Sequence, residues 1–161
     1  MHFFILNRRY RLPFNLSLIK YNYILKNEIE IEMEMGSMKM AHTCYRVKDL
    51  EASKAFYKEA FGFEIAEEKD FPEHEFTLTY LSLPGDDYEL ELTYNYGSEA
   101  YDLGNGYGHI AIAVEDLEAL HASQSEKGLD VTDLKQLPGD TKPRYFFVTD
   151  PDGYKIEVIR L

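Results

Sequence analysis

The chain has 161 residues, enough for one ordinary domain or for two small halves that share a core. Hydrophobic residues make up 45% of it and charged residues 29%, which is typical of a folded globular protein. The formal net charge of −12 argues against nucleic acid or an anionic membrane as a partner, because both bind through clustered Lys and Arg. The single cysteine, Cys44, cannot form an intrachain disulfide, so we expect a cytoplasmic protein.

Residues 1–37 differ in composition from the rest of the chain. They are rich in Phe, Ile, Leu, Asn, Lys and Tyr, and end in a stretch that alternates Glu with Ile or Met. Polar residues interrupt the apolar run and no small-residue cleavage site follows, so we predict neither a signal peptide nor a membrane span of about 20 apolar residues. We interpret 1–37 as a disordered leader or translated upstream segment, with Met38 or Met40 as the natural start. An arm that packs on a partner subunit is the alternative.

The second half of the chain repeats the first. The segment from His42 to Ala52 aligns with the segment from His109 to Ala119 at an offset of 67 residues, with His, Val and Asp-Leu-Glu-Ala in step. The sequence YELEL at 88–92 answers YKIEV at 154–158, at an offset of 66. A repeat of this kind predicts two copies of one structural unit, at about 39–95 and 107–161.

Each unit is predicted to be a strand, a helix and three further strands. Alternating apolar residues predict the first strands, Asp49 and Asp116 are expected to cap the helices, and Gly62 and Gly128 to end them. The strands are predicted at 41–47, 64–68, 75–83 and 89–94 in the first unit, and at 109–114, 130–132, 144–148 and 154–159 in the second. The predicted fold class is α+β, with two βαβββ modules that form one concave mixed sheet.

Two residue types recur at equivalent places: a His on the first strand and a Glu on the last. The pairs are His42 with Glu91 and His109 with Glu157, 49 and 48 residues apart. Two imidazoles and two carboxylates suit nickel, cobalt, iron, manganese or zinc, and leave two octahedral positions open. Each Glu lies in an apolar strand, where a carboxylate that faced the core would be costly without a cation. We therefore predict a metal site, against the alternative that both Glu side chains face solvent on edge strands.

Strand alternation places further residues on the face of these ligands. Cys44 and Arg46 follow His42 by two and four residues, and Asn95 follows Glu91 by four. An arginine beside a metal favours an anionic substrate, and a surface charge paired with a carboxylate is the alternative. We expect Cys44 to be a small buried residue and neither a ligand nor a nucleophile, because its counterpart Ala111 is also small.

Several blocks carry a family resemblance over about residues 38–161. They are HT at 42–43, RV at 46–47, ELTYN at 91–95, GHIA at 108–111 and DPDGYKIE at 150–157. Together they resemble bacterial glyoxalase I, within the vicinal oxygen chelate superfamily. The resemblance implies the glyoxalase/bleomycin-resistance/dioxygenase fold and a homodimer whose sites each take two metal ligands from each chain. It also implies nickel or cobalt, with zinc as the less favoured metal.

The resemblance further implies a lactoylglutathione lyase that detoxifies methylglyoxal. The substrate would be the hemithioacetal of methylglyoxal and glutathione, which becomes a lactoyl thioester through an enediolate that a metal ion stabilises. Glu157 matches the family's catalytic base, and Glu91 would assist on the opposite face. Arg46 and Asn95 match the contacts to the glutamyl carboxylate.

Two departures from the family pattern leave the thiol open. Asn105 stands where some relatives have an arginine that contacts the thiol, and GDTKPR at 139–144 replaces a Gly-Gly-Thr run. Lys135, Lys142 or Arg144 could therefore hold the glycyl carboxylate, and another small thiol could replace glutathione. The alternative functions are an epimerase, a dioxygenase or a metal-free binding protein of the same fold, whose ligand patterns match the four residues less well.

Overall fold

The computed structural model describes residues 38–161 of the chain. The leader predicted at 1–37 lies outside the described residues. In the part that is described, no helix is long and apolar enough to cross a bilayer.

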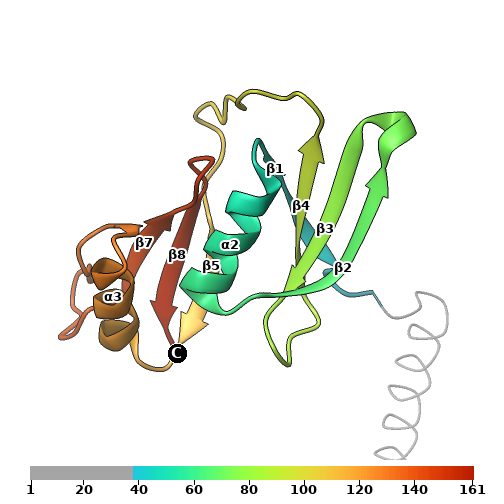
Figure 1. Ribbon diagram of the computed structural model, residues 1–161. Coiled ribbons are helices and arrows are strands. Elements are labelled where there is room, and N and C mark those ends of the chain that lie inside the picture. The colour runs from blue at the N-terminus through green and yellow to red at the C-terminus, as the bar shows by residue number, and fades with distance from the viewer. Residues whose placement is uncertain (1–37) are drawn as a thin grey trace, which may run out of the picture. The chain divides into compact units, whose positions relative to one another are not determined.

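Two modules of the same design follow one another along the chain (Figure 1). The first consists of β1 (His42–Val47), α2 (Leu50–Phe61), β2 (Glu64–Phe71), β3 (Phe76–Ser82) and β4 (Glu89–Asn95), with a 3-10 turn at Pro72–His74. The second consists of β5 (Ile110–Val114), α3 (Leu117–Glu126), β6 (Asp130–Val131), β7 (Tyr145–Thr149) and β8 (Lys155–Arg160). The predicted α+β class and the βαβββ repeat are confirmed.

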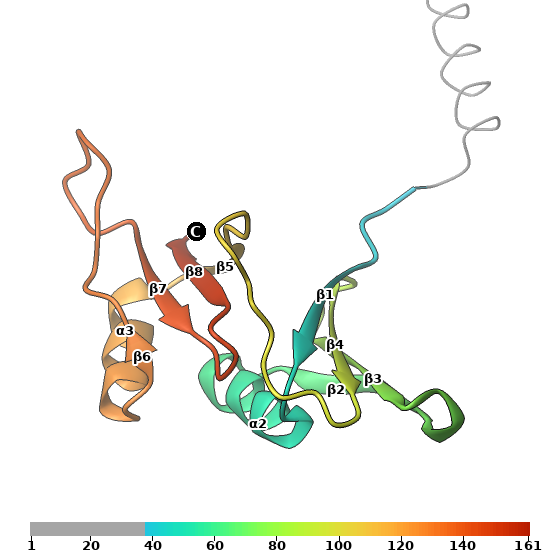
Figure 2. The same cartoon turned by 90° about the horizontal axis from the view of Figure 1, so that it is seen from above.

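The strands form two separate four-stranded sheets. Their orders are β1-β4-β3-β2 and β5-β8-β7-β6, and in each the first pair is parallel while the other pairs are antiparallel. Both views show α2 between the two sheets (Figures 1 and 2). The two modules therefore do not join into one continuous sheet within residues 38–161, because β1 and β5 each end a sheet as an edge strand.

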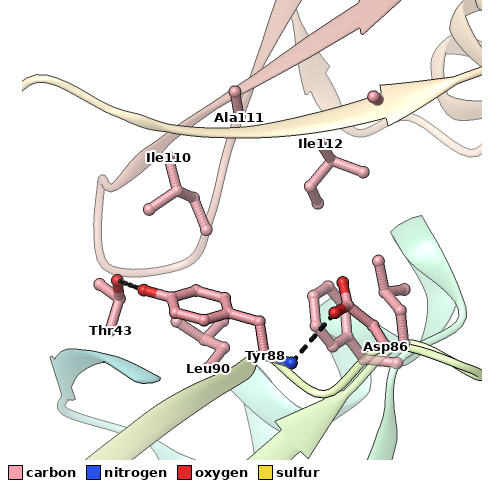
Figure 3. Close-up of a pocket in the computed structure, with 10 residues that line it drawn as sticks. Thr43, Asp86, Tyr88, Leu90, Ile110, Ala111 and Ile112 are labelled. Atoms are coloured by element: carbon pink, nitrogen blue, oxygen red, sulfur yellow. Dashed lines mark hydrogen bonds between the residues drawn. The ribbon is translucent and has the colours of Figure 1, made fainter. Parts of the chain in front are cut away.

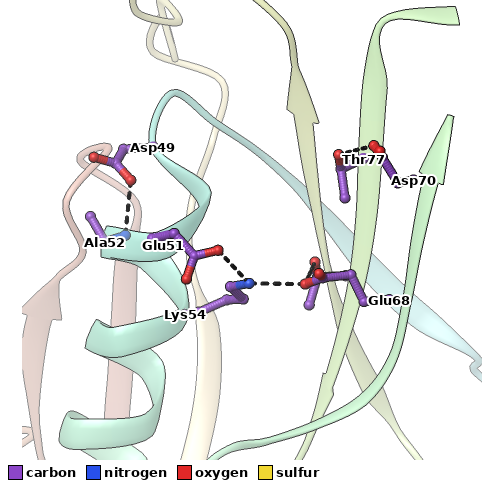
Figure 4. A network of polar contacts seen from close by, with 8 residues as sticks. Asp49, Glu51, Ala52, Lys54, Glu68, Asp70 and Thr77 are labelled. Carbon is purple, nitrogen blue, oxygen red and sulfur yellow. Dashed lines mark hydrogen bonds and ion pairs between the residues drawn. The ribbon is translucent and has the colours of Figure 1, made fainter. Parts of the chain in front are cut away.

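Local sequence signals account for the helix boundaries. The Asp49 side chain accepts a hydrogen bond from the Ala52 N–H at 3.0 Å, and Asp116 caps α3 in the same way through Ala119 at 2.9 Å. Gly62 ends α2 in the left-handed region with φ of 77°, as a helix C-terminus favours. Lys54 on α2 then reaches Glu68 on β2 at 2.9 Å, which ties the helix to the sheet (Figure 4).

Buried contacts join the two modules. The Tyr57 hydroxyl on α2 donates to Asp150 in the β7–β8 turn at 2.9 Å, and the Gln124 amide on α3 donates to the Ala60 carbonyl at 2.8 Å. The rings of Tyr45 and Tyr154 stack with their centroids 4.0 Å apart. These contacts make the modules one packed unit and place each sheet relative to α2.

The largest difference from the predicted boundaries is at β2. The strand runs to Phe71 and not to residue 68, and every residue before Phe71 is exposed. An exposed edge strand of charged residues lacks the apolar alternation by which a strand is recognised, so its end could not be predicted.

Candidate metal centre and substrate pocket

The first module brings His42 and Glu91 together. β1 and β4 pair in parallel with Cys44 opposite Glu91, so His42 lies on the same sheet face two residues away. His42 Nε2 lies 3.2 Å from Glu91 Oε2, and the side chains are 41% and 11% exposed. One nitrogen and one carboxylate oxygen thus point to the same small volume and can coordinate one cation.

The second module repeats this arrangement. His109 comes just before β5, and Glu157 lies in β8, which pairs in parallel with β5. His109 Nε2 lies 3.2 Å from Glu157 Oε2, with side chains 41% and 20% exposed. The geometry of the first pair is therefore reproduced at the equivalent positions.

The four residues do not meet within the chain. Among the described residues, no three His, Cys, Asp or Glu side chains lie close enough together to hold one metal ion. The expectation that both pairs face a common hollow in one chain is therefore wrong, because each pair belongs to its own sheet. The donor types fit a divalent transition metal, but each location offers half of the ligands that such an ion needs.

Hydrogen bonds hold Glu91 in place. Thr93 Oγ1 donates to Glu91 Oε1 at 2.7 Å. Burial works to raise the pKa of Glu91, but hydrogen bonds from Thr93, Cys44 and Tyr80, together with His42, outweigh burial and lower the pKa. Glu91 is therefore ionised at neutral pH, the form that a metal requires.

Cys44 departs from its predicted burial. The residue is exposed, and its Sγ lies 3.2 Å from Thr93 Oγ1. It is exposed because it lies on the β1 face opposite the buried Tyr45 and Val47. Partial burial raises the pKa of the thiol, followed by the influence of Glu91, so the thiol stays protonated at neutral pH and is a poor nucleophile.

Arg46 and Asn95 lie on the same sheet face as the first pair. Arg46 is exposed and pairs in register with Thr93, next to the strand position of Glu91. Asn95 is half-buried at the end of β4, where its Nδ2 donates to the Tyr101 hydroxyl at 2.9 Å. Both side chains are thus on the face that strand alternation predicted, and Tyr101 orients the amide.

A pocket of about 350 Å³ borders Glu157. It is lined by Leu137, Arg144, Tyr145, Phe147, Glu157, Ile159 and Arg160. Of the three basic candidates, Arg144 lines this pocket, and Lys135 Nζ lies 6.0 Å from the ring of Phe147. Lys142 instead acts on Glu118 of α3. The structure therefore places Arg144 closer to the second pair than it places Lys142.

A second pocket of about 350 Å³ lies between the modules and holds none of the four His and Glu residues. Thr43, Tyr88 and Leu90 line one side, and Ile110 and Ile112 reach toward them from β5 (Figure 3). Its apolar lining lacks the charged groups that the predicted chemistry needs. We therefore place the site at the His–Glu pairs.

Sequence reasoning missed two polar neighbours of Glu91. Thr93 could have been found, because it follows Glu91 by two residues and so shares its face. Tyr80 could not, because it reaches Glu91 only through the antiparallel β3–β4 register, which places the two residues opposite each other.

The chain is similar to known proteins over the described modules. The model of the Glyoxalase/Bleomycin resistance protein/Dioxygenase superfamily matches residues 39–158. A lactoylglutathione lyase of Neisseria meningitidis is 42% identical over 76% of this chain and 91% of its own length. A probable lactoylglutathione lyase of Synechocystis is 41% identical over 76% of this chain and 95% of its own. The solved trypanothione-dependent glyoxalase I of Leishmania major is 40% identical, with a TM-score of 0.68 over 77% of this chain and 87% of that one.

Proposed function

Because the chain belongs to the Glyoxalase/Bleomycin resistance protein/Dioxygenase superfamily and is an enzyme of its lactoylglutathione lyase group, we propose that it detoxifies methylglyoxal. Its substrate is the hemithioacetal of methylglyoxal and glutathione or another small thiol, and its product is the lactoyl thioester. The observation that carries the proposal is the pair of His–Glu half-sites at equivalent positions of the two modules.

The four predicted ligands would hold a divalent metal, with nickel or cobalt favoured over zinc. A bound metal would supply electrostatic stabilisation to the negative charge that develops on the substrate oxygens. Imidazole nitrogen and carboxylate oxygen are ordinary ligands of these metals. In each half-site the two donor atoms are 3.2 Å apart, close enough to bind the same ion.

We propose that two copies of the chain complete the site. A two-fold axis would bring His42 and Glu91 of one chain against His109 and Glu157 of the other, which gives two sites per dimer. The sheet faces that carry the half-sites have exposed small or charged residues on β1 and β5, namely Cys44, Arg46, Ala111 and Ala113. A second chain would cover these faces and supply the ligands that each half-site lacks.

Glu157 is the proposed base. A fifth of its side chain is exposed, and it borders a pocket, so a substrate carbon can approach it. Glu157 would take the proton from the carbon that bears sulfur and return it to the neighbouring carbon. The first carbon becomes the thioester carbonyl and the second gains the hydroxyl hydrogen count of lactate, so no outside oxidant or reductant is needed. Glu91 would assist from the opposite side.

Basic and amide side chains would position the thiol. Arg46 and Asn95 are suited to the glutamyl carboxylate, since both lie on the face of the first half-site. Arg144 is favoured over Lys142 for the glycyl carboxylate, because Arg144 lines the pocket beside Glu157. A guanidinium can bind a carboxylate through two parallel hydrogen bonds.

The test uses the full chain stripped of metal and then loaded with nickel, cobalt, zinc or no metal. Formation of the thioester is followed by its absorbance with methylglyoxal and glutathione. We expect turnover that needs metal and falls at least about a hundredfold in Glu157→Gln, the scale of a lost general base. Glu126→Gln, at the exposed end of α3, is the matched control and should leave turnover unchanged.

Other results would redirect the proposal. Turnover with a different thiol alone would change the substrate and keep the reaction. Metal binding without isomerisation of any hemithioacetal would overturn the lyase and favour an epimerase or a dioxygenase. The absence of both metal binding and turnover would favour a binding protein of the same fold.

A further inference from the structure

The two carboxylates of the half-sites occupy equivalent positions but have different neighbours. Glu91 lies opposite Cys44 on β1 and opposite Tyr80 on β3. Glu157 lies opposite Ala111 on β5 and opposite Phe147 on β7. The repeat therefore keeps the backbone arrangement and changes the chemistry around each carboxylate.

The neighbours of Glu91 are hydrogen-bond donors. Thr93, two residues further along β4, donates to Glu91 Oε1 at 2.7 Å. Cys44 and Tyr80 also hydrogen-bond to this carboxylate from the two flanking strands. The other oxygen, Oε2, faces His42 at 3.2 Å. Glu91 is thus held from both sides and along its own strand, with 11% of its side chain exposed.

The corresponding neighbours of Glu157 are apolar. Ile159 takes the place of Thr93, Ala111 that of Cys44, and Phe147 that of Tyr80. None of these side chains has a proton to donate to a carboxylate. Glu157 is more exposed, at 20%, and the pocket of about 350 Å³ gives its side chain room to move.

We infer that Thr93, Tyr80 and Cys44 are positioning residues that hold Glu91 as a fixed ligand, while the apolar neighbours leave Glu157 free to swing as the base. This inference rests on the proposed function and deepens it, because it names the residues that give two equivalent carboxylates unequal roles. Partners that orient a ligand in this way typically change metal affinity or activity by about 10- to 100-fold when they are removed.

The first experiment transfers the tether from one carboxylate to the other. Ile159→Thr places a hydroxyl two residues after Glu157, where Thr93 stands relative to Glu91. Ile159→Val is the reference, because Val and Thr have the same shape and differ in the hydroxyl. We expect Ile159→Thr to have a kcat about tenfold below that of Ile159→Val, with nickel affinity equal or higher.

The second experiment removes the tether from Glu91. Thr93→Val should weaken nickel affinity by about 10- to 100-fold, and Thr93→Ser, which keeps the hydroxyl, should restore it. Affinity is measured by competition with a chelator, and circular dichroism and thermal melting confirm that each variant is folded. Tyr80→Phe tests the donor on β3 and should weaken nickel affinity in the same direction.

The outcomes separate this inference from the proposed function. Equal kcat in Ile159→Thr and Ile159→Val, or unchanged nickel affinity in Thr93→Val, would overturn the unequal roles. A wild-type chain without turnover would overturn the lyase, while the nickel affinities of the Thr93 variants would still show whether Glu91 is tethered.

Discussion

Asp150 should be one of the residues on which folding depends most. It is 5% exposed, and its carboxylate accepts three hydrogen bonds: from the Tyr57 hydroxyl at 2.9 Å, the Asp152 N–H at 2.9 Å and the Tyr154 N–H at 2.8 Å. The first bond links the β7–β8 turn of the second module to α2 of the first. Asp150→Ala would remove all three bonds and the link.

The expected cost follows from which donors stay buried. Tyr57 is fully buried and Tyr154 is 8% exposed, whereas Asp152 is half-buried and can turn to water. Two buried donors without partners cost about 1–3 kcal/mol each. Burial raises the pKa of Asp150, so the wild-type carboxylate already carries a desolvation cost that offsets part of the loss. We therefore expect Asp150→Ala to lower the free energy of unfolding by about 3 kcal/mol.

Urea denaturation of the metal-free chain at fixed protein concentration measures this loss, because bound metal or dimerisation would otherwise shift the transition. Tyr57→Phe removes the donor from the other side, and the double variant should be less destabilised than the two single losses combined. A loss below about 1 kcal/mol for Asp150→Ala, or strict additivity with Tyr57→Phe, would refute the proposed link between the modules.

Three further predictions concern pH, helix capping and site sharing. Because the pKa of Asp150 is raised in the folded chain, its contribution is fully present below the ordinary Asp value and is lost as pH rises through the folded pKa. The stability of the wild type relative to Asp150→Asn should therefore fall as urea midpoints are taken from about pH 3.5 upward; a rise would contradict the raised pKa. Gly62→Ala should cost about 1 kcal/mol in the same assay, because φ is 77° and a Cβ would meet nothing within 4 Å, so backbone strain alone acts. If sites are shared between chains, His42→Ala and His109→Ala should each be inactive, while their refolded equal mixture should regain about a quarter of wild-type turnover, since half the dimers carry one intact site. No recovery, with mixed dimers shown to form, would place each site within one chain.

The ligand pairs could be predicted because their spacing repeats. A His on the first strand and a Glu on the last, at 49 and 48 residues, come together wherever those two strands pair in parallel, and both modules do so. The role of Arg144 was open in the sequence, since Lys135 and Lys142 are near it along the chain. The fold of the 139–144 segment places Arg144 and not Lys142 beside Glu157.

Sequence alone determined the elements of this protein and their repetition, because caps, strand alternation and left-handed glycines act over a few residues. Asp49, Asp116 and Gly62 serve as expected for that reason. Only the tertiary structure decided that the two His–Glu pairs lie in separate sheets, that Cys44 is exposed, and that Tyr80 faces Glu91 where Phe147 faces Glu157. These facts depend on strand register and on how the modules pack, through contacts such as Tyr57 with Asp150 that join residues 93 apart. No local pattern encodes such contacts.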